Sequence, residues 1–150
     1  MFKITAAEKQ WLIKRRRRSV TAMKTVPYPK LDKYALSIAK KAATITDGDY
    51  DSLEDGMIKL LGNRVDAWLS KMNIESETLY YTEDECSIHW QLYEDAGNFT
   101  IRLYMEEGTI RAFVDDDEMK VKKNFVCTLS KPKPVLSSAL AFFSSLVKSW

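Results

Sequence analysis

The apolar residues of this 150-residue chain change their spacing once, close to Met72, and this change restricts the folds that the chain can adopt. Ahead of Met72 they recur every three or four positions, as on one face of a helix. The repeat is clearest in Leu53, Met57, Leu61, Val65, Trp68 and Met72. After Met72 they alternate with polar residues, as on a strand with one buried side. The pattern predicts an α+β fold.

Three helices are predicted ahead of this change. The first lies within residues 1–26, begins at a capping box that starts at Thr5, and ends before Pro27, because proline forces its predecessor out of the helical region. Two amphipathic helices follow within residues 30–73, and the later one begins at a second capping box at Asp51. The apolar face of the earlier one consists of Leu31, Ala35, Ile38, Ala42 and Ile45.

Four strands are predicted within residues 82–130, and an apolar helix follows within residues 134–150. The strands are separated by the turn-like segments EDAGN, EEG and DDDE. Short turns join antiparallel neighbours, so we expect a single α+β domain with about four helices and a four-stranded antiparallel meander, in the order α-α-α-β-β-β-β-α. The last helix either packs in the core or docks on a partner or a second copy. Its stripe consists of Leu136, Leu140, Phe143 and Trp150.

The composition favours an intracellular globular protein. Hydrophobic residues make up 45% of the chain, and neither a secretory h-region nor a membrane-spanning run of about 18 apolar residues is present. The two cysteines, Cys86 and Cys127, both fall inside strand-like runs and are expected to be buried thiols. We therefore expect a cytoplasmic location and no membrane partner.

The formal net charge of +2 conceals three blocks of opposite sign. Residues 1–43 contain 12 Lys and Arg against two acidic residues, a net of +10. Residues 44–118 contain five Lys and Arg against 19 Asp and Glu, a net of −14. Residues 119–150 contain six Lys and no acidic residue, a net of +6. Segregation of this kind indicates that electrostatics directs an interaction.

The motifs of catalysis and metal binding are incomplete. The acidic run that starts at Asp47 has Ser52 and Ile58 where a calcium loop has its turn glycine and its bidentate glutamate. His89 is the only histidine, and with Cys86 it offers too few ligands for zinc. No phosphate-binding glycine loop is present. We therefore predict no catalytic residue, no metal and no cofactor, unless His89 or a buried carboxylate has a strongly shifted pKa in a real pocket.

The outward positions of the strands form a candidate binding face. If the alternate, apolar positions face the helices, the opposite face carries His89, Tyr93, Arg102, Tyr104, Arg111, Phe113 and Lys122. Aromatic and cationic side chains on an open sheet can stack bases and neutralise phosphates. Cross-strand aromatic pairs also stabilise sheets, and a helix could cover this face, so a structural role is the favoured interpretation.

The segment WLIKRRRRSV, residues 11–20, lies inside the first predicted helix. Successive helical residues turn by about 100°, so four consecutive arginines spread around the helix. Arg16 falls on the same side as Leu12 and Val20. The helix must therefore project from the body or lie across an acidic surface, which could belong to nucleic acid, to another protein or to the acidic block of this chain.

Together these features predict a small non-enzymatic binding protein, a regulator or inhibitor such as a viral or phage accessory protein. It would dock on another protein, or on a second copy of itself, through its segregated basic and acidic surfaces. The alternative is a protein that binds DNA or RNA through its basic helix and sheet face; an unrecognised enzyme is the weakest alternative. The predicted binding residues are Trp11, Lys14, Arg15, Arg16, Arg17, Arg18, Tyr93, Arg102, Tyr104, Arg111, Phe113 and Lys122.

Overall fold

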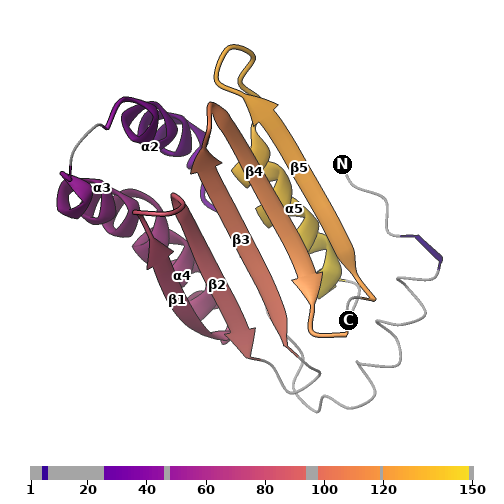
Figure 1. Cartoon of the computed structure of the whole chain (residues 1–150). Coiled ribbons are helices and arrows are strands. Elements are labelled where there is room, and N and C mark those ends of the chain that lie inside the picture. Colours follow the sequence, from indigo (N-terminus) through magenta and orange to yellow (C-terminus); the bar gives the residue numbers. More distant parts are fainter. Residues whose placement is uncertain (1–4, 7–25, 46–47, 94–97, 119, 149–150) are drawn as a thin grey trace.

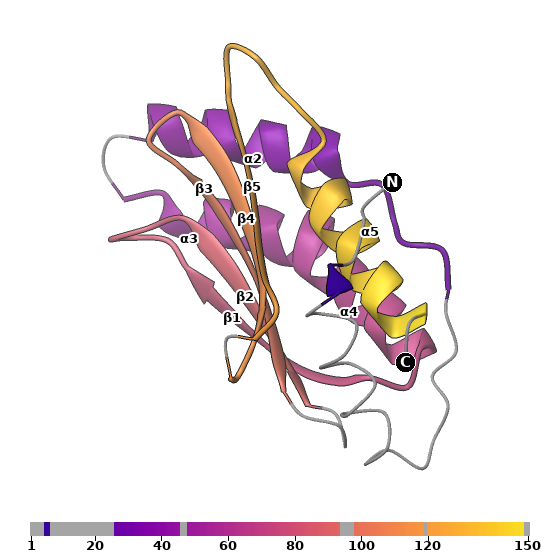
Figure 2. The ribbon, with the colours of Figure 1, turned by 90° about the vertical axis from the view of Figure 1, so that its right-hand side faces the viewer.

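The chain folds into one antiparallel β-sheet with helices packed against one of its faces (Figure 1). The computed structural model describes residues 5–6, 26–45, 48–93, 98–118 and 120–148. Figure 2 shows α4 and α5 on one side of the sheet. The predicted α+β class is therefore confirmed, and the helices and strands differ from the prediction in detail.

The helices described are three continuous segments. The first, α2, spans Asp32–Thr44. The second runs through α3 (Tyr50–Met57), a π-helical turn η1 (Ile58–Gly62) and α4 (Asn63–Lys71) without a break. The third, α5, spans Val135–Lys148. None of the helices in the described ranges is long and apolar enough to cross a membrane.

The segment formed by α3, η1 and α4 is called the central helix, and its apolar stripe is buried as predicted. Its six members are between 0% and 3% exposed: Leu53, Met57, Leu61, Val65, Trp68 and Met72. The predicted start of this helix is wrong, because α3 begins at Tyr50. Its N-cap is Asp49, two residues ahead of the predicted N-cap Asp51. Asp51 therefore lies inside the first turn, where its negative charge still favours the positive end of the helix.

Five strands form the sheet in the order β1-β2-β3-β4-β5, each antiparallel to the next. Their bounds are Glu75–Tyr81, Ser87–Tyr93, Phe99–Glu106, Thr109–Asp116 and Lys122–Thr128. The four predicted strands correspond to β2–β5, and the meander connection between them is as expected. The prediction of a four-stranded sheet is corrected by β1, which adds an edge strand next to β2.

The extra strand β1 has polar side chains on its inward face, which explains why no alternation of apolar residues marks it. Ser76, Thr78 and Tyr80 pair across the ladder with Leu92, Trp90 and Ile88 of the core. These inward groups are used by the helix behind them, since the Thr78 hydroxyl donates a hydrogen bond to Asp66 Oδ1 at 2.6 Å. A strand whose inner face makes polar contacts to a helix lacks the hydrophobic period that identifies strands.

Close packing between β1 and the central helix depends on Gly62 at the end of the π-helical turn. A Cβ at this position would overlap the Tyr80 hydroxyl oxygen and lie 2.6 Å from Tyr80 Cζ. Burial, with added repulsion from Asp66 and Glu54, raises the pKa of Tyr80 to about 12. The absence of a side chain at Gly62 thus lets the Tyr80 ring reach the helix backbone.

The core lies between the inner face of the sheet and the helices. Helices α3 and α4 contact β1, α2 contacts β3 and β4, and α5 contacts β4 and β5. The α5 side chains Leu136, Leu140 and Phe143 are at most 1% exposed, and Phe143 packs edge-on against Trp68 and Phe99. Three members of the predicted stripe therefore lie in the core, which is the first of the two alternatives that the sequence left open, while Trp150 lies outside the described residues.

Some predicted features fall outside the described residues. Of residues 1–26, where the first helix is predicted, only Thr5, Ala6 and Val26 are described, so Trp11 and the basic run from Lys14 to Arg18 lie outside, as does Trp150. Both cysteines are free and buried, as the sequence predicts.

Candidate functional site

The face of the sheet that points away from the helices is the candidate site, and we call it the open face. It consists of the outward, alternate residues of each strand, and no helix or strand among the described residues covers it (Figures 1 and 2). Trp90, Leu103 and Val114 are 0% exposed on the inner face, so their strand neighbours point outward. The ladder places Arg102 between His89 and Phe113, and Tyr104 opposite Arg111.

All seven residues predicted for the outward side share the open face. Lys122 pairs with Asp115 at the β4–β5 ladder, and Tyr93 pairs with Glu75 at the β1–β2 ladder. Cross-strand partners lie on the same side of a sheet, so both belong to this face. The structure thus brings together the strand residues of the prediction, while the basic run of the first helix lies outside the described residues.

Four rings form a continuous line across β1 to β4, which we call the aromatic stripe: Tyr81, His89, Tyr104 and Phe113. Successive ring centroids are 4.9 Å apart for Tyr81 and His89, 5.5 Å for His89 and Tyr104, and 5.7 Å for Tyr104 and Phe113. The last two pairs meet edge to face, an arrangement that aromatic rings favour. Sequence reasoning missed Tyr81, because it lies on the strand that was not predicted.

Each arginine of the open face is held between a ring and a carboxylate. Arg102 Cζ lies 5.1 Å from the Phe113 centroid, and its Nη2 lies 3.3 Å from Asp115 Oδ2. Arg111 repeats the arrangement one row away. Its Cζ lies 5.4 Å from the Tyr104 centroid, and its Nη2 lies 3.6 Å from Glu106 Oε1. The arginine side chains are 31% and 43% exposed, so their charges are partly desolvated and locally neutralised.

The open face is consequently balanced in charge and is not cationic. The outward strand positions carry Arg102, Arg111 and Lys122 against four carboxylates, a net of −1. The carboxylates are Glu75, Glu77, Glu106 and Asp115. The sequence suggested a basic patch here, because pairing between strands cannot be read from the spacing of residues along one strand.

Asp115 is the most buried charged group of this face. Its side chain is 9% exposed, and burial raises its pKa, while the positive charges of Arg102 and Lys122 act in the opposite direction. Its Oδ1 atom has no hydrogen-bond partner among the described residues. A carboxylate that is desolvated and has one oxygen without a partner costs stability.

His89 is surrounded by groups that suggest a catalytic triad, but the geometry differs. The Ser87 hydroxyl donates to Glu85 Oε2 at 2.8 Å and lies 3.2 Å from His89 Nε2, and the same Nε2 is 3.9 Å from Glu85. A triad needs the serine and the acid on different imidazole nitrogens. Ser87 is moreover 0% exposed. Burial lowers the pKa of His89, Arg102 adds to the lowering and Glu85 opposes it, so the ring is neutral near pH 7.

Tyr93 and the edge strands mark the margins of the open face. Tyr81 and Tyr93 are each 40% exposed and Val126 is 57% exposed. The Tyr93 hydroxyl, which has one proton to donate, lies 3.2 Å from Glu77 Oε2 and 3.0 Å from Gln91 Oε1. The contact with Glu77 raises the pKa of Tyr93. Large apolar surface therefore remains accessible on both sides of the paired arginines.

A pocket of about 240 Å³ adjoins the open face where β2 begins and β3 ends. Its helix side is lined by Ala42, Ile45, Tyr50 and Leu53. Its strand side carries five carboxylates, which we call the acidic end: Glu83, Asp84, Glu85, Glu106 and Glu107. Glu85 also contacts Ser87, and Glu106 also contacts Arg111, so the acidic end and the aromatic stripe are continuous.

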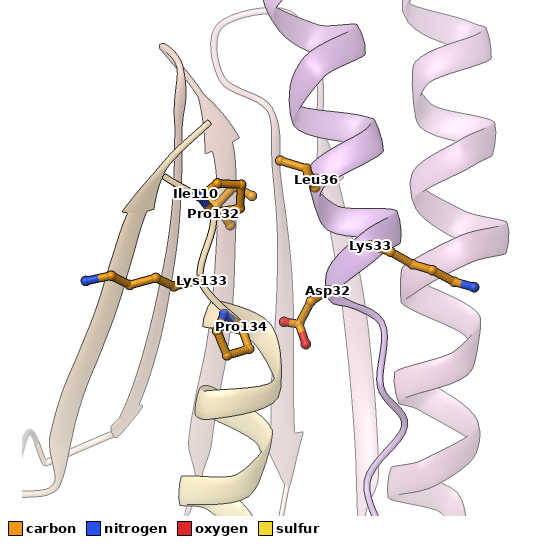
Figure 3. Close-up of a pocket in the computed structure, with 7 residues that line it drawn as sticks. All are labelled: Asp32, Lys33, Leu36, Ile110, Pro132, Lys133 and Pro134. Atoms are coloured by element: carbon orange, nitrogen blue, oxygen red, sulfur yellow. The ribbon is translucent and has the colours of Figure 1, made fainter. Parts of the chain in front are cut away.

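A second pocket of about 180 Å³ lies between α2 and the segment that leads into α5 (Figure 3). Lys33 and Lys133 point away from it on opposite sides. Asp32 is already engaged, because its carboxylate accepts hydrogen bonds from the backbone N–H and the hydroxyl of Ser137. Because the one carboxylate that lines it is already bound to Ser137, this hollow serves to join α2 to the start of α5.

Metal and thiol chemistry find no support in the described part of the chain. Within it, no three His, Cys, Asp or Glu side chains are grouped closely enough to hold a metal ion. Asp47, the first residue of the calcium-like run, lies outside the described residues. Burial, with added repulsion from Glu106, raises the pKa of Cys86 to about 12, so this thiol is a poor nucleophile at neutral pH.

Comparison of the chain with protein-family models, with curated proteins and with solved structures found no match. The open face is therefore the feature from which a function is inferred.

Proposed function

We propose that this chain is a non-enzymatic binding protein that docks on a partner protein through its open face and regulates the partner by occupying its surface. The observation that carries the proposal is the aromatic stripe with its two paired arginines, on a sheet face that no described element covers. Tyrosine and arginine are enriched among the residues that dominate binding energy at protein interfaces.

The charge of the open face favours a protein over a nucleic acid as the ligand. Binding to DNA or RNA depends on cations that neutralise phosphates. Arg102 and Arg111 are each engaged by a carboxylate, and the face has a net charge of −1. A base that stacked on Tyr104 or Phe113 would compete with the guanidinium group that lies over each ring.

The size of the open face suits a regulatory contact. Five strands about 4.8 Å apart and seven residues long at about 3.3 Å per residue give about 550 Å². A standard interface buries about 800 Å² on each partner, so a partner that also covered the neighbouring acidic end would approach that size. The rings supply rigid contact area, while the paired charges fix the orientation of the partner.

Site-specific photo-cross-linking tests the proposal. The photoreactive residue p-benzoylphenylalanine replaces Tyr81 on the open face or, as the control, Lys59, an exposed residue of the central helix. In cells that naturally express the chain, Tyr81 should yield a defined protein adduct that Lys59 does not, and Tyr104→Ala should abolish it. Equal adducts from the two positions, or none from Tyr81, would contradict the proposal.

Fluorescence anisotropy with single-stranded DNA and RNA at low salt separates the nucleic-acid alternative. The proposal expects no change in anisotropy when Arg102 and Arg111 are both replaced by alanine. Binding that depends on these two arginines would show that the open face is a nucleic-acid site and would overturn the proposed function.

A further inference from the structure

We infer that the partner of the open face is a second copy of this chain, whose basic N-terminal segment docks on the aromatic stripe and the acidic end. The inference rests on the proposed function, that the open face binds protein, and it names the bound segment as residues 11–18. Three properties support it: the charge of the receiving surface, the composition of the segment and the reach of the chain.

The receiving surface combines apolar contact with negative charge. The pocket at the acidic end is lined by five carboxylates and by no lysine or arginine. Three of these carboxylates belong to the exposed residues Glu83, Asp84 and Glu107. The helix side of the pocket is apolar, and the aromatic stripe begins beside Glu85. Such a surface selects a ligand with apolar side chains next to several cations.

Residues 11–18, WLIKRRRR, have this composition. Trp11, Leu12 and Ile13 supply apolar contact, and the five consecutive cations that follow match the five carboxylates in number. Arginine suits the site because its alkyl stem packs on apolar surface while the guanidinium group pairs with carboxylates. The arrangement also explains why arginines can surround this helix, since those on the inner side then meet acidic groups.

The reach of the first helix that the sequence predicts favours a segment from another copy. The Trp68 indole N–H donates a hydrogen bond to the Val26 carbonyl oxygen at 2.8 Å, which fixes the start of the described body near the C-terminal end of α4. The acidic pocket lies at the other end of the central helix, beside Tyr50. Eighteen residues of helix separate Tyr50 from Trp68, or about 27 Å.

In the helix that the sequence predicts, Arg15 to Arg18 lie eight to eleven residues ahead of Val26, or about 12–17 Å from it. A segment in this helical form would fall short of the acidic end of its own chain. A second copy has no such restriction. Two copies could exchange segments and close a dimer, or each could bind the next and form a chain of copies.

Multi-angle light scattering of the full-length protein, after nuclease treatment, measures the association. Exposed charges are screened over about 10 Å at 0.1 M salt and about 3 Å at 1 M salt. The expected result is a mass above that of the monomer at about 0.1 M salt, with dissociation at about 1 M salt. A monomer at both salt concentrations over the accessible range of protein concentration would overturn the inference.

Two sets of charge-removing variants locate the contact. Replacing Arg15 to Arg18 by glutamine, or making Glu83→Gln, Asp84→Asn and Glu107→Gln together, should weaken association at least about tenfold. The matched control for the first set removes four cations that are exposed in the described part of the chain: Lys30, Lys59, Lys131 and Lys133. The control for the second removes three exposed acids that belong neither to the acidic end nor to the open face: Asp55, Asp117 and Glu118. Equal weakening by the controls would contradict the inference.

Charge reversal provides the decisive test of the contact. A variant with Arg15 to Arg18 changed to glutamate should be monomeric, and so should one with Glu83, Asp84 and Glu107 changed to lysine. The variant that carries both reversals should associate again, and circular-dichroism melting checks that all three remain folded. Failure of the combined variant to associate would overturn the inference. Cross-linking from Tyr81 to a different protein would remain as evidence for the proposed function, so the two can fail separately.

Discussion

The two faces of the sheet differ in burial and in the kinds of side chain that they carry. On the inner face Ile88, Trp90, Ile101 and Leu103 are fully buried and contact only the core. On the outer face the corresponding positions carry rings, arginines and carboxylates that are partly exposed and contact one another. The same strands therefore hold an apolar layer that stabilises the fold and a polar layer that the fold does not require.

The two faces also differ in how much they contribute to the stability of the fold. Burying apolar surface stabilises a fold by about 25 cal/mol per Å², whereas exposed ion pairs contribute about 0–1 kcal/mol. Arg102, Arg111 and Asp115 each leave a buried polar atom without a partner among the described residues, and so does Trp90 Nε1 on the inner face. The rings and paired arginines of the outer face are the groups on which the proposed docking of a partner depends.

The sharpest comparison uses two neighbours on β3 that point to opposite faces. Leu103→Ala should lower the free energy of unfolding by about 2–5 kcal/mol, because it opens a cavity in the core. Tyr104→Ala should cost about 1 kcal/mol, the value of its edge contacts with His89 and Phe113. Urea denaturation followed by circular dichroism measures both. A loss for Tyr104→Ala as large as that for Leu103→Ala would mean that the outer face is part of the core.

A second prediction concerns the contact between the inner side of β1 and the central helix. Gly62→Ala should destabilise the protein by about 1–3 kcal/mol, because the added methyl group must displace the Tyr80 ring. The cost should fall when Tyr80→Ala is also present, since the space is then free. A double-mutant cycle by chemical denaturation measures this coupling. Additive effects of the two changes would show that the ring does not depend on the glycine.

The inner face could be predicted from the sequence to a large extent, because an element with one buried side has apolar residues at regular intervals. The stripe from Leu53 to Met72 and the alternation in β2 to β4 both have one buried side, and each was found, whereas β5 was predicted from a less regular run. The strand β1 was missed because its inward residues bond to a helix instead of filling the core. The apolar α5 was found as a helix, but its pattern did not show which of its sides would be covered.

The outer face could be predicted only as a set of residues and not as a network. A period of two places Arg102 and Tyr104 on the same side, so the members were correct. Their partners come from other strands: Asp115 is thirteen residues from Arg102, and Tyr81 lies on the unpredicted strand. The register between strands decides whether an arginine is free or neutralised, and that register is set by the whole sheet.

The smallest predicted effect is the titration of His89, which tests whether the outer face is partly dry. Burial and Arg102 should hold its pKa below the ordinary value of about 6.5. His89 is the only histidine, so its ring signals in an NMR titration are unambiguous. Glu85→Gln should lower the pKa further, because it removes the charge that opposes the shift. A pKa at the ordinary value of about 6.5 in the wild type would mean that the ring is solvated.

The same shift gives a sign for the pH dependence of stability. Between the lowered pKa of folded His89 and about 6.5, the unfolded chain binds more protons than the folded one. The contribution of His89 therefore stabilises the fold increasingly as the pH rises through this window, and it is lost as the pH falls through it. Denaturation of wild type and His89→Gln on both sides of the window should show a difference that grows toward neutral pH. A difference of the opposite sign would place a favourable partner for the imidazolium on the open face, and the face would then have to be regarded as an acidic surface throughout instead of an apolar stripe with an acidic end.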